Sequence, residues 1–228
     1  MHMKYLSLAT AIALAFPLTA SAAITLIADP ADYGSSPAVF TANPETNTPA
    51  ARGITGTRQL RQTFQFGSTL TITSMVLSLN LTLGSTGGLD IEIFEVANVN
   101  ASPMVAGGAV HSFSIPAGTA LPGSAQRVQF DFTGTDVFTL NQRNTGTEGY
   151  VIQISNGDGV TTIGNLRHTN AATDVFASGK FLLETGLHSG TGIRDAGLSL
   201  TGIVPVPEPS SALLGVAALV GLTRRRRA

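Results

Sequence analysis

The chain has 228 residues, no cysteine, 12% charged residues and a formal net charge of −1. Thr, Ser, Gly and Asn fill the spaces between apolar residues, a composition too apolar for a disordered chain and poor in strong helix formers. The lack of cysteine excludes disulfides, thiolate chemistry and cysteine-ligated zinc. The length predicts one main domain with terminal signals.

Charge is distributed unevenly along the chain. Residues 23–205, the predicted main domain, contain 13 acidic and eight basic side chains, a net charge of −5. An acidic domain lacks the positive surface that nucleic acid requires. We therefore expect no nucleic-acid partner.

The N-terminus, residues 1–22, has the three parts of a secretory signal peptide. Lys4 gives a positive start and residues 6–16 are apolar. Ala20 and Ala22 fit the small-residue site of a signal peptidase, with cleavage after Ala22. The alternative is a buried N-terminal helix. We expect export.

The first clear strand signal is the run MVLSLNLTL at residues 75–83. Its apolar side chains stand at every second position, the period of a half-buried strand. Leu70 and Ile72 stand in the opposite phase, which predicts a bulge near Ser74.

A second run, LDIEIFEV at residues 89–96, places Asp90 and Glu92 on the face opposite its apolar residues. The Gly-rich segment 84–88 between the two runs predicts a hairpin connection. Further strands are predicted at residues 61–66, 109–115, 127–132, 150–155, 180–184 and 196–203.

Many short strands at this spacing, with no convincing amphipathic helix between them, indicate an antiparallel sandwich or barrel. We expect an all-β fold, an antiparallel β-sandwich that occupies residues 23–205.

The last 23 residues, 206–228, read VPEPSSALLGVAALVGLTRRRRA. The run 210–222 has 13 uncharged residues, whereas a comfortable membrane span needs about 20. We therefore expect one short hydrophobic helix, lengthened by snorkelling arginine stems. The positive-inside rule places a basic cluster on the cytoplasmic side. The cluster consists of Arg224, Arg225, Arg226 and Arg227.

Pro207, Glu208 and Pro209, followed by this apolar helix and the arginines, resemble the tripartite PEP-CTERM sorting signal. The resemblance implies an inner-membrane-anchored precursor that an exosortase-type enzyme processes during export to the bacterial cell surface or extracellular matrix. Two alternatives are an ordinary single-pass membrane anchor and a basic nucleic-acid-binding tail. The second leaves the apolar run unexplained.

The main domain also resembles the jelly-roll bodies of many PEP-CTERM surface proteins. The matching stretches are RQLRQTFQF, LDIEIFEV, RVQFDF and DAGLSLTG. The likeness extends to carbohydrate-binding modules of similar architecture, although fold likeness confers no activity. A non-catalytic surface or matrix protein is the preferred interpretation, and a module that binds surface or matrix polysaccharide is the alternative.

Aromatic platforms for sugar stacking are scarce. The predicted domain has no Trp, and Tyr33 and Tyr150 are its only tyrosines. Tyr150 opens an alternating strand and is expected in the core or at a sheet edge. Four phenylalanines at strand spacing are predicted core residues: Phe64, Phe66, Phe130 and Phe132.

No enzyme motif stands out. His188 and Ser189 with Asp195 suggest a triad, but no Gly-x-Ser-x-Gly elbow accompanies them, so we interpret this segment as a solvated loop. Glu92 and Glu95 fall on opposite strand faces unless the alternation shifts phase after Ile93, and so do not form a glycosidase pair. We expect no catalytic residues.

Metal-binding signals are weak as well. His111, His168 and His188 show no metal-ligand spacing. Asp158 sits in a tight Gly-rich turn at residues 156–159, yet lacks the repeated ligands of a calcium loop. We expect no metal site and no cofactor, with a structural calcium as the alternative.

Overall fold

The computed structural model of the chain describes thirteen segments of it. They are residues 23–30, 33–34, 37–44, 49–55, 58–81, 88–101, 108–116, 127–156, 164–169, 176, 179–183, 186–187 and 194–205. The predicted signal peptide (1–22) and the predicted sorting signal with its hydrophobic helix (206–228) lie outside the described residues. No helix within the segments above is long and apolar enough to cross a membrane.

These segments form strands and one short 3-10 turn, η1 (Gly134–Asp136). The strands are β1 (Ala23–Ala28), β2 (Val39–Phe40), β3 (Pro49–Ile54), β4 (Leu60–Phe64), β5 (Leu70–Leu77), β6 (Leu79–Leu81), β7 (Leu89–Val96), β8 (His111–Ile115), β9 (Val128–Thr133), β10 (Phe138–Leu140), β11 (Gly149–Asn156), β12 (Gly164–Thr169), β13 (Phe181–Leu183), β14 (Gly186–Leu187) and β15 (Leu198–Ile203).

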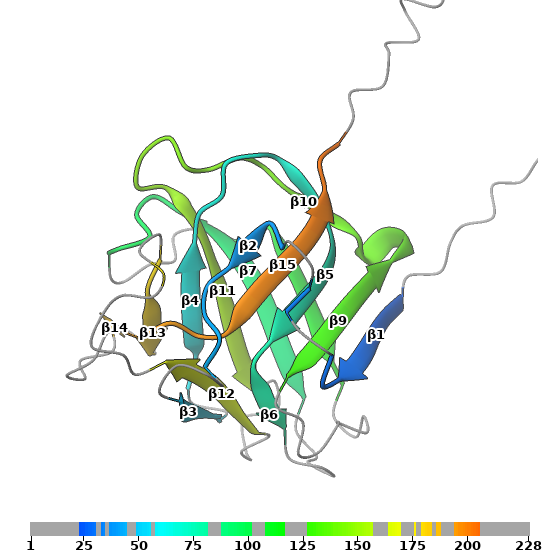
Figure 1. Cartoon of the computed structure of the whole chain (residues 1–228), viewed down its shortest axis with the longest axis vertical. Coiled ribbons are helices and arrows are strands. Elements are labelled where there is room, and N and C mark those ends of the chain that lie inside the picture. Colours follow the sequence, from blue (N-terminus) through cyan, green and yellow to red (C-terminus); the bar gives the residue numbers. More distant parts are fainter. Residues whose placement is uncertain are drawn as a thin grey trace, which may run out of the picture.

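The strands build three antiparallel sheets (Figure 1). Sheet I has the order β1-β9-β5-β15-β2, with β10 also paired to β5. Sheet II has the order β14-β13-β4-β11-β7-β8, and sheet III is β3-β12-β6. In Figure 1 sheets I and II form two layers, and sheet III lies at the lower end. The predicted all-β, sandwich-like antiparallel class is confirmed.

One continuous apolar core joins the three sheets. Sheet I contributes Met75 and Phe130, sheet II contributes Phe64 and Ile91, and sheet III contributes Leu166, each fully buried. The burial pattern of β7 alternates along most of its length, as its period-two sequence predicts. Burial of these side chains, about 1.5–3 kcal/mol each, is the main force that holds the layers together.

Six predicted strands coincide, within two residues at either end, with β4, β8, β9, β11, β13 and β15. Other strands were not predicted: β1, β2, β3, β10, β12 and β14. The sequences of β3 (PAARGI) and β12 (GNLRHT) contain little apolar periodicity. These two strands pair with each other over six residues, so their structure depends on a distant partner.

The predicted bulge near Ser74 is present in β5. The ladder between β15 and β5 passes from Thr201 opposite Ser74 to Gly202 opposite Ile72, so Thr73 is the extra residue. This single insertion moves the buried set from the even to the odd positions of β5, in agreement with the phase change in the sequence.

The predicted hairpin across residues 84–88 is wrong. The run 75–83 breaks at Ser78, where β5 ends and β6 begins. β6 then pairs with β12 in sheet III, whereas β7 pairs with β11 and β8 in sheet II. The two runs therefore belong to different sheets.

The break at Ser78 has a clear physical cause, which we call the Ser78 junction. The backbone N–H of Ser78 donates to the carbonyl of Gly197 at 2.9 Å, and the Ser78 carbonyl accepts from the backbone N–H of Arg167 at 2.8 Å. The Gly197 N–H in turn donates to the Arg167 carbonyl at 3.2 Å. Ser78 is fully buried, so each of these polar groups needs its partner. The junction ties sheet I to sheet III.

The described part of the chain enters and leaves at the same end of sheet I. Thr25, Asp131, Ser74 and Thr201 occupy one row across β1, β9, β5 and β15. Because neighbouring strands are antiparallel, the start of β1 and the end of β15 lie on the same side of this row, about 14 Å apart across three strand spacings. In Figure 1 the start of β1 and the end of β15 are both directed towards the upper right of the picture.

We expect Gly197→Ala to disrupt the Ser78 junction. A Cβ on Gly197 would lie 2.6 Å from Ser78 Cβ and 2.7 Å from Pro44 Cδ. Such overpacking costs about 1–3 kcal/mol of unfolding free energy, measurable by urea denaturation. Gly108→Ala is the matched control, since a Cβ there meets nothing within 4 Å. Equal stability of the two variants would contradict the role of the junction.

Candidate functional site

The outer face of sheet III presents polar and small side chains. In its ladders, Asn165 lies opposite both Asn80 on β6 and Gly53 on β3, and Arg167 lies opposite Ala51. Residues directly opposite each other share a face, so these five residues point the same way. The alternate residues, among them Leu79 and Leu166, are buried in the core. The alternation that buries one face of sheet III thus exposes a polar face on the other side.

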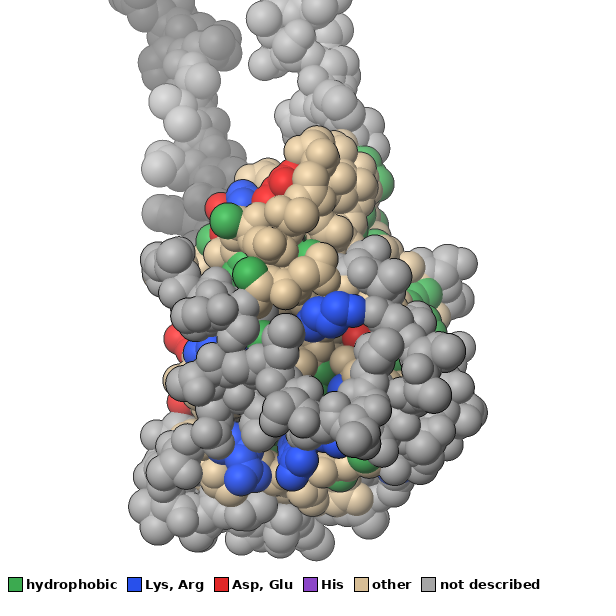
Figure 2. Space-filling view, turned by 90° about the vertical axis from the view of Figure 1, so that its left-hand side faces the viewer, with side chains coloured by type: hydrophobic (Ala, Val, Ile, Leu, Met, Phe, Trp, Pro, Cys, Tyr) green, Lys and Arg blue, Asp and Glu red, His purple; other side chains and the backbone are tan. Residues whose placement is uncertain are grey.

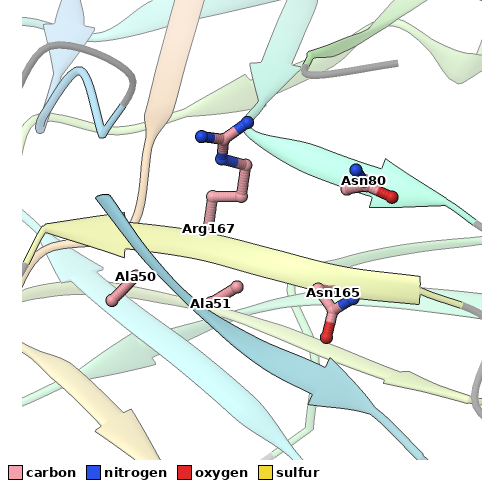
Figure 3. A pocket seen from close by; sticks show the side chains of 5 residues that line it. All are labelled: Ala50, Ala51, Asn80, Asn165 and Arg167. Carbon is pink, nitrogen blue, oxygen red and sulfur yellow. The ribbon is translucent and has the colours of Figure 1, made fainter. Parts of the chain in front are cut away.

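Small residues on β3 leave an open groove on this face. Its volume is about 330 Å³. Figure 3 shows the Arg167 side chain extending from β12 on the side of β6, with the two alanines on β3 on its other side. The lining residues are Ala50, Ala51, Asn80, Asn165 and Arg167. We call this hollow the sheet III groove.

The three polar side chains of the groove retain their hydrogen-bonding capacity. Within the described residues, the amides of Asn80 and Asn165 and the guanidinium of Arg167 take part in none of the side-chain hydrogen bonds or ion pairs. Each amide offers a donor and an acceptor, and the guanidinium offers a planar fork of donors. The groove therefore presents three polar groups that water or a ligand can satisfy.

The strands of sheet III are basic. The three strands of sheet III contain two arginines and no carboxylate. Partial burial lowers the pKa of Arg194, and the positive charge of Arg52 lowers it further. In Figure 2 basic side chains gather in the lower part of the visible face, the end at which sheet III lies. The acidic domain thus has a local basic region.

The side chains of the groove are suited to binding and not to proton transfer. Arginine stays protonated at all physiological pH values, and asparagine does not titrate. Among the described lining residues there is no nucleophile, carboxylate or imidazole. Hydrogen bonding and anion pairing are the chemistry available there.

The sequence did not indicate this groove. The sequence pattern identifies Asn80 only as a polar position of an alternating strand, and it does not predict the strand that contains Asn165 and Arg167. The alternation in Asn-Leu-Arg-His, with the amide and guanidinium on one face, was the available signal.

Glu92 and Glu95 do not form a catalytic pair. The ladder of β7 with β11 runs in register through both residues, so the two side chains point to opposite faces. Glu92 accepts a hydrogen bond from Gln153 Nε2 at 2.8 Å, and Glu95 forms an ion pair with Arg143 at 2.9 Å. The placement on opposite faces is confirmed, and no phase shift intervenes in the ladder.

Asp195 is not in a solvated loop, and that part of the interpretation is wrong. It is fully buried and accepts hydrogen bonds from Gln62 Nε2 at 3.4 Å and the Phe176 N–H at 3.2 Å. Its own N–H donates to Thr169 Oγ1 at 3.0 Å. Asp195 therefore ties sheet II to sheet III. His188 and Ser189 lie outside the described residues.

The described histidines lie in separate aromatic environments. The His111 ring stacks on Phe138 with 3.8 Å between centroids. His168 is buried, stacks on Phe181 and has its Nδ1 2.7 Å from the carbonyl oxygen of Thr169. The described segments contain no group of three His, Asp or Glu side chains that could hold a metal ion. Asp158 lies outside them.

The aromatic residues expected in the core are there. Tyr150 is 1% exposed and packs against both Phe64 and Phe66, which also contact each other, and its hydroxyl donates to the Asn141 carbonyl at 2.9 Å. Phe130 and Phe132 are buried too, as is Tyr33. Among the described aromatic residues, only Phe40 is largely exposed. The described surface therefore offers little area for sugar stacking.

Comparisons of the chain with models of known families, with curated proteins and with solved structures find no match. A function is therefore inferred from the geometry of the groove, from the positions of β1 and β15 and from the sequence.

Below pH 6.5 we expect the protein to lose stability through His111. Burial lowers the pKa of this imidazole, only partly opposed by Asp136, and its Nε2 is buried without a hydrogen-bond partner in the described structure. The unfolded chain, with a histidine pKa near 6.5, therefore binds the proton first. Stability is complete above about pH 6.5 and falls as pH decreases towards the folded pKa.

Urea unfolding at pH 7.5 and pH 5.0 measures this effect. His111→Phe keeps the stacking on Phe138 and removes the titration, so its free energy of unfolding should fall less between the two pH values. The other histidines are present in both proteins and cancel in the comparison. An identical fall in wild type and variant would contradict the assignment to His111.

Proposed function

We propose that the chain is an exported, non-catalytic protein of the bacterial cell surface or extracellular matrix, sorted by its C-terminal signal. The observation that supports this proposal most directly is the order of parts along the chain. β15 ends at Ile203, and Val204 and Pro205 continue from it on the surface. The Pro-Glu-Pro motif, the apolar run and the arginines follow immediately in sequence.

The arrangement of sheet I supports the same proposal. The segment next to the predicted signal peptide and the segment next to the predicted sorting signal lie at one end of the domain. One end of the folded domain can then face the membrane while both terminal segments engage it. No part of the chain has to cross the domain to reach the bilayer.

In this proposal each terminal segment has its own partner. A signal peptidase cleaves after Ala22, with Ala20 in its small-residue site. The arginines stay in the cytoplasm because moving four positive charges through the bilayer is costly. An exosortase-type enzyme reads Pro207, Glu208 and Pro209 on the outer side. The precursor is held in the inner membrane and the product is released to the surface or matrix.

We further propose a jelly-roll arrangement for the domain. Sheet I contains the run β2-β15-β5-β9, and sheet II contains the run β4-β11-β7-β8. In chain order, the connections among these eight strands change sheet at every step but one, from β7 to β8. This order corresponds to the two interlocked Greek keys of an eight-stranded jelly roll. β1, β10, β13 and β14 extend the sheets, and sheet III is an addition.

The absence of catalysis is part of the proposal. It is supported by the structural partners of the carboxylates considered for catalysis, because Glu92, Glu95 and Asp195 each bond to a side chain from a distant segment of the chain. A carbohydrate-binding function differs from this proposal in class, and the sheet III groove is the feature that favours it.

Replacing Glu208 should separate recognition from membrane insertion. With the apolar run and arginines intact, Glu208→Gln should insert normally and accumulate unprocessed, because only the motif is changed. Mass spectrometry of the C-terminus reads the result directly. In a host that has the processing enzyme, an intact Ala228 on the mature surface form of the wild type would reduce the tail to a simple membrane anchor.

The arginines should act through charge. Substitution of all four by serine should release or misorient the precursor, whereas substitution by lysine keeps the charge and should keep the orientation. Protease accessibility of the domain in spheroplasts distinguishes the two variants. Normal orientation of the serine variant would show that the arginines do not fix the topology.

A further inference from the structure

We propose that the sheet III groove binds an acidic polysaccharide through its carboxylated sugar residues. Arg167 pairs with the sugar carboxylate, and Asn80 and Asn165 form hydrogen bonds with sugar hydroxyls. The inference goes beyond sorting, because it assigns a ligand to the folded domain itself.

The positions of the three side chains suit a ligand of this kind. Asn80 and Asn165 are opposite each other, about 5 Å apart at their Cβ atoms, and Arg167 is two residues further along β12, about 7 Å away. The planar guanidinium matches a carboxylate with two parallel hydrogen bonds. The amides donate and accept, as a hydroxyl does. One sugar residue and its neighbour can contact all three groups.

The shape of the groove favours a chain over a small enclosed ligand. The groove is open to solvent, and its described lining residues on β3 are the small Ala50 and Ala51, so this strand presents no bulky side chain to a polymer that crosses the groove. Such contacts on rigid strands require little reordering of the protein on binding. An extended ligand then gains affinity by occupying the groove with any of its repeating units.

The described residues that line the groove favour an acidic saccharide over nucleic acid. Arg167 is the cation among the described residues that line the groove, and its guanidinium can pair with an anion. The described lining residues include no aromatic side chain on which a base can stack. The net charge of −5 of the whole domain disfavours any polyanion, so the attraction has to be local, between Arg167 and one sugar carboxylate. A carboxylated saccharide uses the local charge and the amides together.

The groove also faces away from the proposed anchor, a point that rests on the proposed function. The backbone carbonyl of Arg167 accepts a hydrogen bond from the N–H of Gly197, which lies just before β15. β15 then runs from Leu198 to Ile203 towards the opposite end of the domain. Six strand residues span about 20 Å. A protein held by its C-terminus would therefore present the groove outward, to the matrix.

Isothermal titration of the full-length chain in detergent tests the inference independently of processing. The probe is a galacturonate hexasaccharide, with a neutral galactose hexasaccharide, inorganic phosphate and a single-stranded oligonucleotide as comparisons. We expect saturable binding of the acidic saccharide, weakened by salt, and little binding of the other three.

Four variants locate the site. Arg167→Gln should weaken binding about tenfold or more. Asn80→Ala and Asn165→Ala should each weaken it about two- to tenfold. Ala51→Ile keeps every polar group and suits a strand, but fills the groove and should weaken binding about tenfold. Arg61→Gln on sheet II changes the net charge equally and should bind like the wild type.

Several results would overturn the inference. They are absent binding by the folded wild type, equal binding of the neutral hexasaccharide, and preference for phosphate or the oligonucleotide. Wild-type affinity of Arg167→Gln would do the same. If Arg167→Gln fails to fold, as judged by its thermal unfolding, the exposed Ala51→Ile substitution decides, and its unchanged affinity would also overturn the proposal.

Discussion

The structure depends on how the chain satisfies its backbone at the Ser78 junction. Ser78 is buried where β5 would otherwise continue straight, and both its N–H and its carbonyl bond to other segments, at Gly197 and Arg167. A buried polar group left without a partner costs about 1–3 kcal/mol, so this arrangement has no inexpensive alternative. The chain turns from sheet I into sheet III at this point. That turn brings Asn80 opposite Asn165 and so assembles the groove.

Buried polar side chains extend the junction across the core. Gln62 Oε1 accepts from the Ala196 N–H at 2.7 Å, and Thr41 Oγ1 accepts from the Leu198 N–H at 3.0 Å. With Asp195 and Thr169, these side chains bond the segment 195–198, which approaches all three sheets. Polar residues inside an apolar core are costly unless paired, and here each pairing fixes one position of this segment. The position of β15, and with it the direction of the chain end, follows from these bonds.

This arrangement places the ends of the described chain and sheet III at opposite ends of the domain. The end of sheet I at which β1 begins and β15 ends is adjacent in sequence to the predicted export signals. The other end holds sheet III with its arginines and amides. The proposed attachment and the proposed ligand contact therefore do not compete for the same surface. An antiparallel sandwich provides this separation readily, because antiparallel strands place entry and exit at one end whenever an odd number of strand steps separates them.

The sequence by itself determined the fold class, the period-two strands and the bulge beside Ser74, because these follow from local alternation between apolar and polar residues. It also placed Glu92 and Glu95 on opposite faces, and it left Tyr150 either in the core or at a sheet edge. The tertiary structure alone decided that the run 75–83 divides between two sheets, that Asp195 is buried, and that β3 pairs with β12. Each of these depends on a partner distant in sequence: Gly197 for Ser78, Gln62 for Asp195, and one polar strand for another. Local periodicity contains no information about such partners, and the groove exists only where three of these strands meet.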